Sequence, residues 1–162
     1  MSVLKYNVAY EMVQAHSKVQ EARQIEKDAI VQKLEERHVQ LKDLSSVITE
    51  LTNKKSSGKV NFNSDPELIK LIDRVREANR DSHTGHSIIP DNTYSWNSEK
   101  EIENILTVLN DHVKIIAGEI NTETMRMQEE YKITLEITDI SQKTLDMLIR
   151  FIESILNKMR AG

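Results

Sequence analysis

The scarcity of glycine and proline constrains this chain more than any other feature. Its 162 residues include four Gly and two Pro, about a third of the share found in an average protein. Sandwiches, barrels and βαβ folds use these residues at their turns, so the composition disfavours all three. Residues 6–53 contain neither type, and residues 98–160 contain only Gly118. We therefore predict an all-α chain that is more than about 70% helical, twice the typical level.

The apolar residues of the first stretch recur at coiled-coil spacing. Leu34, Leu41 and Ile48 lie seven residues apart, and so do Leu44 and Leu51. This heptad spacing predicts a seam that packs against a second helix. The rhythm slips near residues 23–27 and then resumes. We predict one long helix over residues 6–53.

The middle of the chain, residues 54–97, reads as a linker, a short helix and an irregular loop. Lys, Ser and Gly fill the linker. Asp65-Pro66-Glu67 favours a helix start, because Asp caps free amides and Pro suits the first helical position. We place the short helix at residues 65–79. Ser98 and Glu101 have the spacing of a capping box that opens a long helix over residues 98–160.

The last helix carries two apolar stripes, and a helix with two stripes needs two neighbours or an assembly. The first stripe continues the coiled-coil seam, which we predict to comprise Leu34, Leu41, Leu44, Ile48, Leu51, Ile105, Leu109, Val113, Ile116, Ile120, Met127, Tyr131 and Leu135. The second stripe and the carboxy-terminal end are predicted to form an assembly or partner interface, which comprises Ile133, Ile137, Ile140, Leu145, Leu148, Ile149, Phe151, Ile152, Ile155, Leu156 and Met159.

Helix length bears on the predicted shape. A helix over residues 98–160 would extend about 95 Å, whereas a compact globule of this chain length is roughly 40 Å across. The helix must therefore fold back, at Gly118 or near residues 138–141, or the molecule is elongated. We favour a single elongated domain over residues 1–162, an antiparallel helical hairpin with a short third helix.

The residues that could carry chemistry are few. The chain has no Cys, which removes thiolate metal sites and cysteine nucleophiles. His83 and His86, with Asp81 or Asp91, are the best metal candidates, but they lie in a predicted loop and lack a full ligand set. No phosphate-binding glycine loop or nucleophile elbow occurs. We predict no catalytic, metal or cofactor site, and hence no enzyme.

The charge and hydropathy of the chain restrict its possible partners and its cellular location. The net charge of −4 disfavours binding to a nucleic-acid backbone. The first twenty residues hold no apolar run typical of a cleaved signal peptide, and no stretch reaches the roughly 18 apolar residues of a membrane span.

Trp96 has two interpretations: it covers the end of the helical pair, or it anchors a partner, because Trp is frequent among interface hot spots.

The order of parts resembles a known family. A polar amino terminus and a long helix precede Asp65-Pro66-Glu67-Leu68-Ile69-Lys70-Leu71-Ile72, a Gly-containing loop and the terminal helix Ile102–Met159. This layout resembles the hydrophilic translocators of bacterial type III secretion, the needle-tip proteins and the EspA/SseB-like filament subunits. The middle insert is short beside the larger domains of the tip proteins, which favours the filament subunits.

The resemblance implies a subunit that is secreted to the bacterial surface without a cleaved signal peptide. It further implies homo-oligomers, a dedicated chaperone that covers the apolar helix stripes, and contact with membrane-inserting translocators. The alternative is an intracellular, cytoplasmic coiled-coil adaptor or secretion chaperone that binds a partner helix. Both hypotheses use the same apolar faces.

Overall fold

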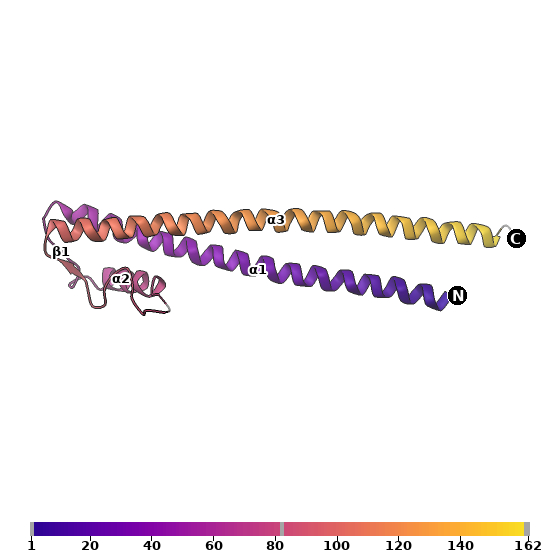
Figure 1. Ribbon diagram of the computed structural model, residues 1–162, viewed down its shortest axis with the longest axis horizontal. Coiled ribbons are helices and arrows are strands. Elements are labelled where there is room, and N and C mark those ends of the chain that lie inside the picture. Colours follow the sequence, from indigo (N-terminus) through magenta and orange to yellow (C-terminus); the bar gives the residue numbers. More distant parts are fainter. Residues whose placement is uncertain (1, 82, 161–162) are drawn as a thin grey trace. The chain divides into compact units, whose positions relative to one another are not determined.

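The structure is a computed structural model that describes residues 2–81 and 83–160 (Figure 1); the side chains of residues 2–9, 12, 156, 159 and 160 are not described. The chain is 80% helical, which confirms the predicted all-α class. Its elements are α1 (Ser2–Lys55), β1 (Val60–Asn61), α2 (Pro66–Ala78), β2 (Ser95–Trp96) and α3 (Glu99–Arg160). The helix α3 continues through Gly118. Each long helix lies within a few residues of its predicted bounds.

The chain divides into two compact units, and each takes part of α1 and part of α3. Unit 1 comprises residues 1–31 and 124–162, and unit 2 comprises residues 32–123. The two long helices run antiparallel (Figure 1). The single elongated domain stays a prediction.

The apolar core of the described residues lies in unit 2. Leu44 and Leu51 of α1 and Leu109 of α3 are fully buried, and Ile116 is 1% exposed. Of the seam residues predicted in this unit, Ile105 also belongs to the core, Leu41, Ile48, Val113 and Ile120 pack against it, and Leu34 lies outside it. Burying large side chains contributes about 1.5–3 kcal/mol each. Unit 2 is therefore stabilised in the ordinary way, by apolar burial.

The short helix begins and ends where the sequence indicates. The Asp65 carboxylate accepts the amide N–H groups of Glu67 and Leu68, each at 3.1 Å, and Asn79 is the C-cap residue. At the start of α3 the amide of Glu101 donates to Ser98 Oγ at 3.3 Å, as a capping box requires. These contacts satisfy amide groups that have no partner within the helix.

The loop region differs from the prediction by a small sheet. β1 and β2 pair antiparallel, with Val60 opposite Trp96. This pairing places Trp96 on Phe62, with ring centroids 6.0 Å apart and the rings nearly perpendicular. Two-residue strands carry no alternating pattern long enough to recognise, because that pattern needs at least four residues.

A buried arginine holds the loop before α3 in place. Arg76 of α2 is 6% exposed. Its guanidinium donates to the carbonyl oxygens of Pro90 and Thr93 at 3.2 and 3.0 Å, and it pairs with Asp73. A charged group this buried is tolerated only when its donors are used. Arg76 therefore replaces the regular hydrogen bonds that the irregular loop lacks.

Candidate assembly surface

In unit 1 the two helices meet through charged and polar side chains. Arg23 Nη1 of α1 donates to both carboxylate oxygens of Glu130 on α3, at 2.6 and 2.8 Å. Arg126 Nη2 of α3 donates to Glu26 on α1 at 2.7 Å. Charge-assisted hydrogen bonds of this kind are about twice as strong as neutral ones. They take the place that apolar side chains occupy in unit 2.

The same contact continues along both helices. Ser141 Oγ lies 3.0 Å from His16 Nδ1, and Lys27 Nζ lies 6.0 Å from the ring centroid of Tyr131. Among the described residues of unit 1, only Ile30 and Glu130 are classed as buried. This pairing therefore has very little apolar core.

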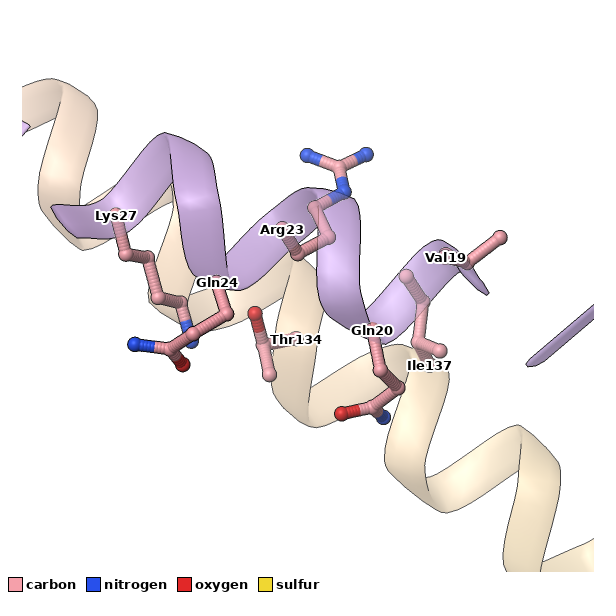
Figure 2. Close-up of a pocket in the computed structure, with 7 residues that line it drawn as sticks. All are labelled: Val19, Gln20, Arg23, Gln24, Lys27, Thr134 and Ile137. Carbon is pink, nitrogen blue, oxygen red and sulfur yellow. The ribbon is translucent and has the colours of Figure 1, made fainter. Parts of the chain in front are cut away.

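A small cleft of about 70 Å³ lies between the helices. Figure 2 shows Thr134 and Ile137 of α3 beside Gln20 and Gln24 of α1. The cleft is lined by Val19, Gln20, Arg23, Gln24, Lys27, Thr134 and Ile137. Its small size suits water better than an organic ligand.

The side of α3 that faces α1 follows from helical spacing. Glu130, Thr134, Ile137 and Ser141 are separated by steps of four, three and four residues, so they share one side. Across from them α1 presents Gln20, Arg23 and His16. Because α1 offers polar groups here, α3 turns a carboxylate and two hydroxyl groups toward them.

This orientation leaves another side of α3 exposed, and it corrects the predicted seam. Met127, Tyr131 and Leu135 were expected to pack against α1, but they are 41%, 61% and 53% exposed. The same stripe continues through two exposed polar residues and three more exposed apolar ones. We call it the exposed α3 face, and it comprises Met127, Tyr131, Leu135, Thr138, Gln142, Leu145, Ile149 and Ile152.

The predicted assembly interface is divided by the structure. Ile137 lines the cleft and is half-buried, and Ile133, Leu148 and Ile155 are half-buried as well. Ile137 therefore lies beside α1, and the other three lie on or near the side of α3 that carries Glu130 and Ser141. The residues of the predicted assembly interface that are exposed are Ile140, Leu145, Ile149, Phe151 and Ile152. The side chains of Leu156 and Met159 fall outside the described residues.

Trp96 is not available to anchor a partner. It is 5% exposed and belongs to the core of unit 2. The packing of Trp96 on Phe62 favours the alternative interpretation, in which this indole covers the end of the helical pair. The anchor expectation is corrected because the β1–β2 pairing draws the side chain inward.

The histidine-containing loop forms a hydrogen-bonded turn. The Asp81 carboxylate accepts the amide N–H groups of Thr84 and His83 at 2.7 and 2.8 Å, and these bonds lower its pKa. Arg80 donates to Asp91 at 2.8 Å and lowers the pKa of that carboxyl group. Among the described residues, no three His, Asp or Glu side chains gather where they could hold a metal ion.

Comparison with protein families, with characterised proteins and with solved structures finds no match to this chain. The likeness to type III translocators therefore rests on the layout of the sequence. Within the described residues, no helix has a stretch both long and apolar enough to cross a membrane.

The ionic contact of unit 1 predicts the effect of removing one partner. Replacing Arg23 with Met removes the guanidinium donor of Glu130, whose residue is nine-tenths buried. We expect unit 1 to lose about 2 kcal/mol, between the values for exposed and buried pairs. The double variant R23M/E130L should recover most of this loss, because an apolar pair needs no desolvation of charge.

Far-UV circular dichroism during urea unfolding measures this change, and the fluorescence of Trp96, the sole Trp, reports unit 2 separately. R23M should shift the loss of helical signal to lower urea concentration and leave the midpoint of the Trp96 fluorescence transition unchanged. Lys18→Met, an exposed change on the same part of α1, is the matched control. Equal shifts from R23M and K18M would show that the ion pair does not hold unit 1 together.

Proposed function

We propose that this protein is a structural subunit that assembles through the exposed α3 face, rather than an enzyme. The more specific form of the proposal is a secreted subunit of a type III secretion translocon or extracellular filament. The observation that carries the assembly role is the row of six apolar side chains left 41–61% exposed on one side of α3.

Such a row is costly for an isolated molecule. Exposed apolar residues that are scattered singly are normal, but two groups of three on one side of a helix, as found here, indicate an interaction site. Helices bind other helices through residues spaced three and four apart, which is the spacing found here. The face therefore has the form of a helix-binding surface that lies open in the monomer.

The secretion role is supported by the sequence layout. The absence of Cys and the weakly stabilised pairing of unit 1 suit a chain that must unfold to pass through a narrow conduit. The same face would require cover before export, and a dedicated chaperone that supplies a helix would provide it. The membrane-inserting translocators are the partners that this role implies outside the cell.

The assembly role predicts the effect of charge on the exposed α3 face. Replacing both Leu135 and Ile149 with Lys should leave the fold intact, because both side chains are 53% exposed. Self-association should be lost, because lysine ammonium groups would have to be desolvated in an apolar contact. Sedimentation velocity from low to high micromolar concentration measures this difference.

The matched control is the double variant V108K/I115K, which places the same charges at exposed positions of α3 in unit 2. It should associate like the wild-type chain. A wild-type chain that stays monomeric at high micromolar concentration, or an L135K/I149K variant that associates normally, would contradict the assembly role.

Location separates the secreted subunit from a cytoplasmic adaptor or chaperone. We expect the protein in the culture supernatant when the type III system of its own cell is induced, and we expect deletion of residues 1–20 to retain it inside. Immunoblotting of supernatant and pellet, with a cytoplasmic enzyme as the lysis control, measures this. Retention of the full chain during active secretion would favour the adaptor.

A further inference from the structure

Along the exposed α3 face, the order of apolar and polar residues is the same from either end of the helix. Three apolar residues, Met127, Tyr131 and Leu135, are followed by the polar pair Thr138 and Gln142 and then by Leu145, Ile149 and Ile152. All eight side chains are exposed. A face of this kind can match a second copy of itself that runs in the opposite direction.

The register of such a pairing follows from residue positions. Leu135 and Leu145 lie five residues before and after position 140, and Tyr131 and Ile149 lie nine residues before and after it. In two antiparallel copies related by a two-fold axis near residue 140, these partners lie opposite each other. Met127 of one copy then lies beside Ile152 of the other. Every apolar side chain of the face meets an apolar side chain.

The polar residues fix this register. Thr138 and Gln142 lie two residues on either side of position 140, so the hydroxyl group of one copy meets the amide of the other. The Gln142 amide already lies near Asp146, at 3.4 Å, and it can exchange this weak exposed contact. Sliding the copies by one heptad would place these polar groups against apolar side chains, at a cost of about 1–3 kcal/mol for each unsatisfied group.

The charged row beside the face favours the antiparallel direction. Lys132, Asp139 and Asp146 lie on the side of α3 away from the Glu130–Ser141 side that contacts α1. In the antiparallel pair this row meets its own copy, with Lys132 of each copy within two residues of the position opposite Asp146 of the other. Asp139 lies near the axis and is paired with Lys143 at 2.6 Å, which offsets its charge there. A parallel pair would instead set this charged row against the α1 side of the second copy.

The size of the face is sufficient for a specific dimer. Six apolar side chains with 41–61% of their surface exposed lie on this face of each copy, together with two exposed polar side chains. Standard interfaces bury about 800 Å² per partner, including their polar rim. A second copy therefore covers the face without further rearrangement of unit 1.

We propose that a second copy of this chain occupies the exposed α3 face, antiparallel and about a two-fold axis near residue 140. This rests on the proposed assembly role and specifies its partner and geometry. A two-fold contact closes on itself. A filament therefore requires a further contact, and the other exposed apolar residues of this helix segment, among them Ile140 and Met147, are available for it.

Single cysteines test the geometry directly, because the chain has no Cys of its own. We would prepare Tyr131→Cys and Ile149→Cys separately and oxidise each alone and as an equal mixture. The antiparallel pair brings residue 131 of one copy to residue 149 of the other, so the mixture should yield several-fold more disulfide-linked dimer than either variant alone. Ile115→Cys, exposed on α3 in unit 2, measures cross-linking by random collision.

Each outcome decides a different claim. Strong cross-linking of each variant alone would show a parallel pair and overturn the inference. The mixture could instead yield no more disulfide-linked dimer than the Ile115→Cys control, although the chain sediments as an oligomer. That result would overturn the antiparallel geometry and leave the assembly role standing. A wild-type chain that sediments as a monomer at high micromolar concentration would overturn both. Helical circular dichroism of every variant verifies that its fold is retained.

Discussion

The ion pair between Arg23 and Glu130, in which one guanidinium nitrogen contacts both carboxylate oxygens, is the interaction on which unit 1 depends. It draws a carboxylate into the contact between α1 and α3, where a coiled coil ordinarily places a large apolar residue. Since Glu130 occupies that position, one apolar stripe of α3 is rotated out of the contact, whereas Ile137 remains beside α1. The ion pair thus has two consequences: it sets which side of α3 meets α1, and it leaves the apolar stripe through Tyr131 and Ile149 in solvent.

The two units differ in the force that stabilises them. Unit 2 buries Leu44, Leu51 and Leu109 completely and adds Arg76 to hold its loop. Unit 1 relies on hydrogen-bonded charges, whose net contribution is small because both partners lose hydration. A segment held in this way opens at lower free energy than the apolar core. The surface proposed for assembly therefore lies in the less stable part of the chain.

The sequence was sufficient to predict unit 2 but not the orientation of α3 in unit 1. Heptad spacing identified Leu44 and Leu51, the apolar stripe of the last helix identified Leu109, and capping rules located Asp65 and Ser98, because these signals depend on local geometry. In the second half of α3 two apolar stripes compete, and spacing alone cannot say which one meets α1. The slip near residues 23–27 was the available signal, since it places Arg23 where an apolar residue was due. The burial of Trp96 was also beyond prediction, because it depends on pairing between two strands that are distant in sequence.

The central claim is that the exposed α3 face is open in the monomer and is covered by a second copy at higher concentration. Hydrogen–deuterium exchange at low and high micromolar concentration tests it most directly. We predict that amides of residues 127–152 become more protected as concentration rises, while those of the unit 2 core, such as residues 102–116, do not change. Protection of residues 127–152 that is independent of concentration would contradict the account.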